Sequence, residues 1–344
     1  MNAETPAGEA EPLPVSISPT DKAIRYIGRF EFGQNGVRCE WSASTIALRF
    51  RGTELNAKFK DGGQNRWQIE IDGKAEGVLQ MEKGEHLYRA ASGLSAGEHS
   101  VRLVRATEAF FGPCQIEGFQ IAEGSLLPVT SAAHRIEVIG DSISCGYGNE
   151  AANQKEHFSA KTENAYFTYG AIAARALGAD YSCIAWSGRK MWPDFTTPEI
   201  YDLIVPTEPG TKWDFSKAQP ADVVLINLST NDFSKANPEE AGWSGAYKQF
   251  VARLRKLYPQ AMIYCVTSPM LGDWDHRKPL TVSRDYLRKI VADCNSAGDN
   301  KVRLIEFPTQ EMKNGLGADW HPNVKTQTLM GEQFTQAIRA ELHW

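Results

Sequence analysis

Three residues beyond residue 133 have the types and spacing needed for nucleophilic catalysis. Ser142 lies in the segment 140–144 (GDSIS), a predicted tight turn at the start of a helix, where a serine hydroxyl can project beside converging backbone N–H groups. His321, in the segment 318–322 (ADWHP), is the candidate base. Because alternate side chains of an extended loop point to the same side, Asp319 could hydrogen-bond His321 and stabilise its charged form. These residues predict acyl transfer through a Ser-His-Asp triad.

Two further residues could stabilise the negative charge that develops on a carbonyl oxygen in such a reaction. Gly188 follows a predicted strand and leaves its backbone N–H unobstructed, and Asn231 follows the next strand with a side-chain amide. Together with the backbone N–H of Ser142, they would form an oxyanion hole. Each residue also has an ordinary explanation: Ser142 could be a helix N-cap, Gly188 a turn glycine, and Asn231 part of an Asx turn or a helix cap. Their joint occurrence, each after a different strand, favours an active site.

The elements that must position these residues are those of a parallel sheet. Beyond residue 133, short apolar runs alternate with amphipathic segments, which is typical of buried strands covered by helices. The predicted strands cover residues 136–139, 181–185, 223–227, 263–266 and 302–307, and the predicted helices cover 164–177, 239–258, 282–296 and 324–342. This order predicts a flavodoxin-like doubly wound α/β fold, which binds ligands beyond the carboxyl ends of its strands.

The first part of the chain has a different period. Apolar and polar residues alternate between about residues 23 and 122, as in 67–72 (WQIEID), where the hairpin signal Asp72-Gly73 follows. We therefore predict a two-domain chain, with an all-β, jelly-roll-like sandwich over residues 21–125 and an α/β catalytic domain over residues 126–344. Residues 1–20, rich in Pro, Glu and Ala, are predicted to be a disordered tail.

Composition excludes several kinds of partner. The 344 residues include 37 basic and 42 acidic ones, for a net charge of −5, and the basic residues are scattered. We therefore expect neither nucleic acid nor a membrane surface as a partner. The longest apolar run, 261–266, is far shorter than the roughly 20 residues that cross a membrane. The six cysteines form no C-x-x-C pair and lack a nearby histidine, so no metal site is expected. The oligomeric state stays open.

Four segments resemble the four sequence blocks of SGNH (GDSL-like) hydrolases: Gly140-Asp141-Ser142, Gly188, Asn231-Asp232 and 319–322 (DWHP). More narrowly, 140–148 (GDSISCGYG), 162–166 (TENAY) and 319–322, behind a β-sandwich, resemble carbohydrate esterase family 2. This resemblance covers nearly all of residues 21–344. It implies an acetyl esterase that acts on plant polysaccharides such as acetylated xylan or glucomannan, with a preference for primary 6-O-acetyl groups. It also implies that no metal or organic cofactor is needed.

Two residues depart from the SGNH pattern. Ser229 stands where the third block usually has glycine, and Asp319 lies two residues before His321 instead of the usual three. With this spacing, a backbone carbonyl near Trp320 could orient His321 instead, which would make the machinery a Ser-His dyad. The sequence leaves both arrangements open.

Tryptophans near these loops could stack on sugar rings. Trp192, Trp274 and Trp320 are the candidate substrate-binding residues, whereas core packing is favoured for Trp186. Two other functions stay open. A short-chain esterase, lipase or thioesterase of the same superfamily would act on non-carbohydrate esters, and a long acyl chain would need an apolar channel. A non-catalytic carbohydrate-binding protein would bind sugar without turnover.

The cellular location is not encoded in a visible signal. Residues 1–20 contain neither a basic region nor an apolar region of the kind that a signal peptide needs. A polysaccharide substrate would favour a secreted or periplasmic protein whose signal peptide is absent from the given sequence, and a cytoplasmic location also stays open.

Overall fold

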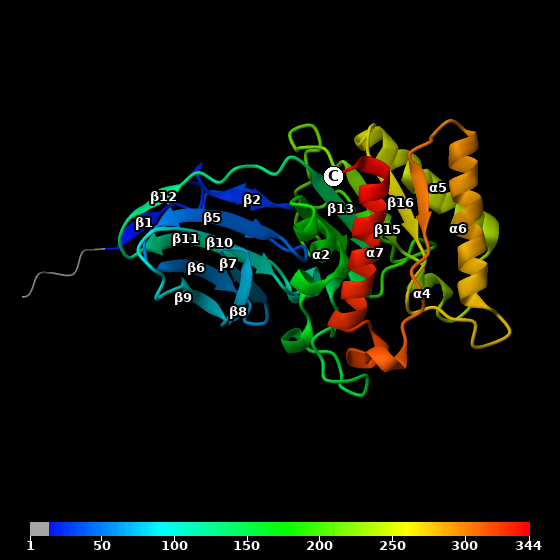
Figure 1. Ribbon diagram of the computed structural model, residues 1–344, viewed down its shortest axis with the longest axis horizontal. Helices are drawn as coiled ribbons and strands as arrows, with labels where there is room; N and C mark the ends of the chain where they lie inside the picture. Colours follow the sequence, from blue (N-terminus) through cyan, green and yellow to red (C-terminus); the bar gives the residue numbers. More distant parts are fainter. Residues whose placement is uncertain (1–13, 209) are drawn as a thin grey trace, which may run out of the picture.

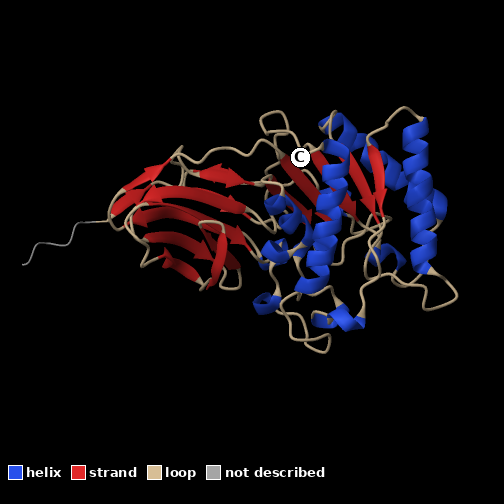
Figure 2. Ribbon diagram, viewed as in Figure 1, coloured by secondary structure: helices blue, strands red, loops and turns tan. Residues whose placement is uncertain are grey.

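The computed structural model describes residues 14–208 and 210–344, which form two domains lying end to end (Figure 1). Figure 2 shows that strands make up the N-terminal domain, whereas the C-terminal domain has a sheet flanked by helices. The two-domain prediction, all-β followed by α/β, is confirmed.

The N-terminal domain is a sandwich of two antiparallel sheets. In one, the strand order is β3-β4-β11-β6-β9 with β1 beside β11, and in the other it is β12-β5-β10-β7-β8 with β2 beside β5. The strands are β1 (Val15–Ile17), β2 (Arg25–Ile27), β3 (Glu31–Gly33), β4 (Gly36–Cys39), β5 (Thr45–Arg51), β6 (Leu55–Asp61), β7 (Arg66–Ile71), β8 (Lys74–Gln80), β9 (Gly84–Ala91), β10 (Glu98–Arg105), β11 (Cys114–Ile121) and β12 (Ser125–Leu127). In β6, alternate residues such as Leu55, Ala57 and Phe59 are fully buried, as a period of two requires.

Two predicted boundaries are wrong. The tail predicted over residues 1–20 includes β1, which pairs with β11 and buries Ile17 between the sheets. Residues 1–13 lie outside the described residues. The domain boundary predicted at 125/126 cuts through β12, which pairs with β5 and so belongs to the sandwich. Both segments contain only three strand residues, too few for a periodic pattern to show.

The C-terminal domain contains a parallel sheet in the order β14-β13-β15-β16-β17, the doubly wound arrangement that was predicted. Its strands are β13 (Arg135–Gly140), β14 (Asp180–Ala185), β15 (Val223–Asn227), β16 (Met262–Val266) and β17 (Val302–Ile305). Its helices are α1 (Ser142–Cys145), α2 (Tyr169–Ala176), α3 (Thr197–Ile200), α4 (Thr230–Phe233), α5 (Glu240–Leu257), α6 (Pro279–Ser296) and α7 (Val324–Leu342). Short 3-10 helices are η1 (Ala109–Phe111), η2 (Ala160–Thr162), η3 (Ala165–Phe167), η4 (Met312–Asn314) and η5 (Ala318–Trp320).

Helices cover both faces of this sheet. Helices α2 and α7 share a core with one face, to which Tyr169 and Phe334 contribute, and α5 and α6 share a core with the other, to which Phe250 and Leu287 contribute. The helix predicted over 164–177 is divided into η3 and α2 at Thr168. Among the described residues, no helix is long and apolar enough to cross a membrane.

Buried contacts join the two domains. Trp41 of the sandwich belongs to the core of the catalytic domain, and its indole N–H donates to the Leu203 carbonyl at 3.0 Å. The Tyr166 hydroxyl donates to Glu70 of β7 at 2.8 Å, and the backbone N–H of Ala165 donates to the Ala106 carbonyl at 2.9 Å. The domains therefore meet through apolar packing and hydrogen bonds, with η3 against the sandwich.

Candidate active site

Ser142 is placed by the turn between β13 and α1, at the carboxyl edge of the sheet. Asp141 is the N-cap of α1, and its buried carboxylate accepts a hydrogen bond from the backbone N–H of Ile143 at 3.0 Å. Gly140 is required because a Cβ at this position would lie 2.1 Å from the Ser144 hydroxyl oxygen. The N-cap role that a serine often takes thus belongs to Asp141, which leaves the Ser142 hydroxyl available for another partner.

That partner is His321. Nε2 of His321 lies 2.9 Å from the Ser142 hydroxyl oxygen. Nδ1 lies 3.2 Å from each of two backbone carbonyl oxygens, those of Ala318 and Asp319. Because a carbonyl can only accept, the proton of the neutral ring must be on Nδ1, and Nε2 is then free to accept the Ser142 proton. The structure therefore brings the predicted nucleophile and the predicted base together in the geometry that proton transfer needs.

The predicted role of Asp319 is wrong in this geometry. Its carboxylate accepts from the Tyr147 hydroxyl (3.0 Å), from the backbone N–H of Phe158 (2.9 Å) and from Nδ1 of His157 (3.0 Å). The prediction assumed an extended loop, but Asp319 and Trp320 both have left-handed backbone conformations, with φ of 48° and 66°. This turn directs the Asp319 side chain away from His321, and backbone carbonyls orient the imidazole, as in the dyad alternative.

Asp319 instead braces an aromatic residue that the sequence did not single out. The Tyr147 ring stacks on the His321 ring with centroids 4.0 Å apart, and on its other side it stacks on Phe158, also at 4.0 Å. Because the Asp319 carboxylate holds the Tyr147 hydroxyl, it fixes the surface against which the imidazole packs. Tyr147 lies in the GYG part of the 140–148 segment, and nothing in its spacing from His321 could have revealed the stack.

The loop that carries His321 is docked on the turn after α1. The backbone N–H of Ala318 donates to the Gly148 carbonyl at 3.0 Å, and that of Val324 donates to the Asn149 carbonyl at 3.1 Å. Gly148 has φ +55°, and a Cβ there would lie 2.3 Å from the Ala318 Cβ. The glycine at 148 therefore allows the two loops to approach closely, which sets the distance between Ser142 and His321.

The electrostatic setting keeps His321 neutral. Burial lowers its pKa from 6.5 to about 4, against the opposing effects of the two carbonyl contacts and the charge of Asp319. For Asp319, partial burial would raise the pKa, but the bonds from His157, Phe158 and Tyr147 outweigh it and hold the pKa below its ordinary value. At neutral pH the site therefore holds a neutral base close to a carboxylate.

Gly188 and Asn231 lie on the same side of the site. Gly188 is exposed and has φ +81°. The Asn231 side-chain amide donates to the Arg189 carbonyl at 2.9 Å, and a longer contact of 3.4 Å leads to Asp141. Asn231 is therefore tied to the residues next to Gly188 and to Ser142. Because the 3.4 Å contact is weak, Nδ2 of Asn231 has one N–H available to donate to an oxyanion.

A pocket of about 410 Å³ opens beside Gly188 and Asn231. Trp192 lines it and also packs against the core, over Gly242. The loop that carries Trp192 is held by Asp232, whose carboxylate accepts from the backbone N–H groups of Met191 and Trp192. Asp232 is part of the third sequence block, but its role as a loop anchor was not predicted.

The other tryptophans differ in exposure. Trp274 is 75% exposed and its ring lies over Gly272, whereas Trp320 is 58% exposed and directly precedes His321. Trp186 packs against the core, which agrees with the interpretation favoured for it. Trp274 and Trp320 therefore present open aromatic faces, whereas Trp192 is half-buried.

Comparison with known proteins agrees with this architecture. Residues 26–129 match the carbohydrate esterase 2 N-terminal family, and residues 138–329 match the GDSL-like lipase/acylhydrolase family. The chain is 41% identical over 328 residues, 93% of its length, to the cellulase/esterase CelE of Acetivibrio thermocellus, of which it spans 40%. It is 26% identical to an acetylxylan esterase / glucomannan deacetylase of Cellvibrio japonicus, with 96% of this chain and 92% of that protein covered.

A solved structure extends this likeness to three dimensions. The family two carbohydrate esterase from Clostridium thermocellum, solved in complex with cellohexaose, superposes with a TM-score of 0.89 at 40% identity. The alignment covers 93% of this chain and 99% of that one. The chain therefore belongs to carbohydrate esterase family 2, and it is a carboxylic ester hydrolase whose catalytic domain is of the GDSL-like type.

Proposed function

We propose that this esterase removes O-acetyl groups from plant polysaccharides such as acetylated xylan or glucomannan, including primary 6-O-acetyl groups, through a Ser142–His321 dyad. The observation that carries the proposal is the 2.9 Å contact between Ser142 and His321, with the Nδ1 proton held by two backbone carbonyls. The names of the relatives, an acetylxylan esterase / glucomannan deacetylase among them, support the substrate class.

The reaction proceeds in two acyl-transfer steps. His321 takes the Ser142 proton as the serine oxygen attacks the acetyl carbonyl. The imidazolium then gives this proton to the sugar oxygen as its bond to the acetyl carbon breaks, which leaves acetyl-Ser142 and a free sugar hydroxyl. The backbone N–H groups of Ser142 and Gly188 and the Asn231 amide stabilise the oxyanion, each by roughly 2 to 4 kcal/mol. Water, activated by His321, then releases acetate from Ser142.

The lining of the neighbouring pocket favours sugar over a long acyl chain. The polar residues Lys190, Ser234 and Lys235 line it together with Trp192. Such a surface offers hydrogen bonds to hydroxyl groups and one aromatic face, whereas a lipase needs an apolar channel. This pattern supports a carbohydrate leaving group and weakens the lipase and thioesterase alternatives.

The experiment that tests the proposal is acetate release from acetylated xylan, acetylated glucomannan and an aryl acetate, for the wild type and Ser142→Ala. We expect release from at least one polysaccharide, lost in Ser142→Ala. Turnover of the aryl acetate with no release from either polysaccharide would contradict the proposed substrate. Faster turnover of long-chain than of acetyl esters would favour a lipase or thioesterase.

Binding of glucan without turnover is a second candidate role. The open faces of Trp274 and Trp320 favour it, and a relative has been solved in complex with cellohexaose. Calorimetric titration of Ser142→Ala with cellohexaose would detect such binding independently of ester hydrolysis. Loss of affinity in Trp274→Ala, with acetyl esterase activity kept, would separate the two roles.

For the location, we propose that the protein works outside the cytoplasm, because polymeric xylan and glucomannan do not enter cells. Fractionation of the native host, followed by detection of the protein in culture fluid, periplasm and cytoplasm, tests this. Recovery in the cytoplasm alone would contradict it.

A further inference from the structure

A carboxylate of the sandwich domain reaches the turn that carries Gly188. Glu108 precedes η1, between β10 and β11, and is 1% exposed. Its carboxylate accepts from the backbone N–H of Ser187 at 2.8 Å and from the Ser187 hydroxyl at 2.7 Å. Two oxygens of one residue thus hold the backbone and the side chain of the residue directly before Gly188.

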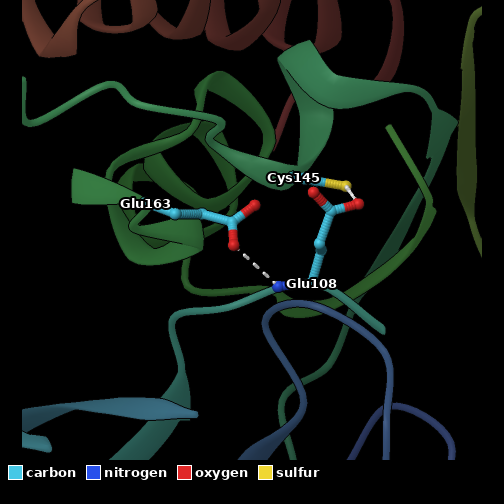
Figure 3. Close-up of side chains that lie close together, drawn as sticks. All are labelled: Glu108, Cys145 and Glu163. Carbon is cyan, nitrogen blue, oxygen red and sulfur yellow. Dashed lines mark hydrogen bonds between the residues drawn. The ribbon is translucent and has the colours of Figure 1, made fainter. Parts of the chain in front are cut away.

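Glu108 is itself fixed by groups of the catalytic domain (Figure 3). Its backbone N–H donates to the Glu163 carboxylate at 3.0 Å, and the Cys145 thiol lies 3.8 Å from its carboxylate. Cys145 is in α1, the helix that begins with Ser142. Glu108 therefore contacts both the helix of the nucleophile and the turn of Gly188, although it comes from the other domain.

The carboxyl groups of Glu108 and Glu163 are both buried and lie within 4.8 Å of one another, so a negative charge on one disfavours a negative charge on the other. Burial and then the charge of Glu108 raise the pKa of Glu163 well above its ordinary value. Burial also raises the pKa of Glu108, but the two Ser187 donors and the thiol oppose the rise. Glu108 receives more donors than Glu163, which favours the negative charge on Glu108 and the proton on Glu163.

The same three side chains have ligand atoms within 4.8 Å of one another, a spacing that a metal ion could occupy. Their donor set fits a cation poorly. Both oxygens of Glu108 already accept hydrogen bonds from Ser187, and one oxygen of Glu163 accepts from Glu108. One carboxylate oxygen and one thiol remain, whereas a closed protein site for zinc uses four ligands. We therefore assign no cation to this cluster.

We propose that Glu108 is a positioning residue for ester hydrolysis, which holds the Ser187–Gly188 turn so that the Gly188 N–H faces the oxyanion. The turn needs such an anchor because Gly188 is exposed, has φ +81° and would have only Phe195 near a Cβ. The sandwich domain then completes the active site instead of only lying beside it. This inference rests on the role given to Gly188 in the proposed function.

The test compares Glu108→Ala and Glu108→Gln in the full chain with para-nitrophenyl acetate. We expect Glu108→Ala to lower kcat about tenfold or more with KM changed less than about threefold, because a displaced oxyanion donor acts on the transition state. Glu108→Gln should recover kcat to within about threefold, since its amide oxygen can accept from the Ser187 N–H while its NH₂ donates to the hydroxyl.

Glu40→Ala is the matched control. Glu40 is also fully buried in the sandwich domain and also accepts from a backbone N–H and a hydroxyl across the interface, both of Thr207, a residue outside the active-site loops. It should lower the melting temperature about as much as Glu108→Ala and leave kcat within about twofold. Equal kcat values for the two alanine variants, per folded molecule, would overturn the proposal, as would a Glu108→Gln variant no better than Glu108→Ala.

Two further measurements keep the proposal testable. If Glu108→Ala does not fold, Ser187→Ala removes one of the two contacts and should lower kcat a few-fold, whereas an unchanged kcat would overturn the proposal. The rate at which a fluorophosphonate labels Ser142 also depends on the oxyanion hole but needs no acetyl ester. A wild type that is labelled yet releases no acetate from polysaccharide would contradict the proposed function, whereas equal labelling of wild type and Glu108→Ala would contradict only the role of Glu108.

Discussion

At the scale of single residues, the orientation of His321 is the most informative feature. Two backbone carbonyl oxygens hold Nδ1, and the nearby Asp319 carboxylate bonds to Tyr147, Phe158 and His157 instead. A carbonyl carries no full charge, so the imidazolium formed during turnover receives less stabilisation than a carboxylate would give it. The residue that the sequence proposed as the orienting acid therefore acts through the Tyr147 stack.

The substitution Asp319→Asn should accordingly lower kcat only mildly. Loss of a carboxylate that orients a catalytic histidine lowers kcat roughly 10⁴-fold in a serine protease, whereas here we expect less than about tenfold. Asparagine tolerates the left-handed backbone at this position, so the loop should keep its shape. Steady-state kinetics with an aryl acetate, beside His321→Ala as the inactive reference, measures this. A loss as large as that of His321→Ala would restore the triad.

The pH dependence of activity follows from the neutral state of His321. Only the neutral imidazole accepts the Ser142 proton, so kcat/KM should rise with pH through the pKa of His321 and then level off. Since that pKa is lowered from 6.5 to about 4, the acid limb should lie well below pH 6.

A profile of kcat/KM from about pH 3.5 to about pH 8 checks this. Activity recovered after return to neutral pH serves as the control for unfolding, because a depressed histidine pKa also removes stability as the pH falls from 6.5 towards 4. A reversible midpoint near 6.5 would contradict the buried setting of His321.

At the scale of elements, the distance between Ser142 and His321 depends on how closely two loops approach. The turn after α1 and the loop of η5 meet at Gly148 and Ala318. Neither loop contains a long regular element, so their approach depends on glycine conformations and backbone hydrogen bonds. Steric changes at the contact should therefore alter catalysis more than the same changes elsewhere.

Gly148→Ala tests this. We expect a fall in kcat of about tenfold or more, because the new Cβ would lie 2.3 Å from the Ala318 Cβ and push the His321 loop away. Gly178→Ala is the matched control, since Gly178 has a similar φ of +61° but no atom within 4 Å of a Cβ. Both variants should lose stability to backbone strain, and only the first should lose activity. Similar kcat values would show that the contact does not set the geometry.

Most of the catalytic domain was predictable because its strands are buried runs and its long helices have a clear period. The helix start predicted at the Ser142 turn is confirmed as α1, but its length of four residues was not predicted, because all of its residues are buried and it shows no amphipathic pattern. Two strands of the sandwich also lack a regular alternation of buried and exposed residues and were not predicted. β8 is a largely exposed edge strand, and in β11 a bulge before Gly118 shifts the alternation by one residue. Ser142, Gly188, Asn231 and His321 were identified because they follow strands.

The remaining site residues could not be found in this way. Tyr147 acts by stacking on a ring more than a hundred residues away along the chain, and Glu108 comes from the other domain. No period or motif relates such residues to their partners. The role of Asp319 was predicted wrongly because side-chain direction was deduced from spacing in an assumed extended loop, and two left-handed residues invert it.

At the scale of the whole molecule, the two domains share parts of their cores. Trp41 of the sandwich belongs to the same buried cluster as residues of β14, β15 and α5, and Val104 of β10 belongs to the same buried cluster as residues of α2 and β13. Hydrogen bonds from Arg25 to Asp180 and from Tyr166 to Glu70 cross the same interface. Unfolding one domain would expose buried surface of the other, so the two should unfold together.

Trp41→Ala should reveal this coupling. Removal of a fully buried tryptophan costs about 3 to 5 kcal/mol, and here the loss falls on both domains. Scanning calorimetry should show one transition for the wild type and one, at lower temperature, for the variant. Separate transitions, of which only one moves in Trp41→Ala, would show that the domains are thermodynamically independent.

The two carbonyls that hold His321 also have a consequence for how this enzyme can be damaged by mutation. Every amino acid has a main-chain carbonyl, so no codon change at positions 318 or 319 deletes the groups that orient the imidazole. In a library of random variants, inactive clones should therefore gather at positions that shape the loop, such as Gly148, and should be rarer at Asp319 than in esterases whose third catalytic group is a side chain. The sequence determines this third group only indirectly, through the backbone conformation of the loop.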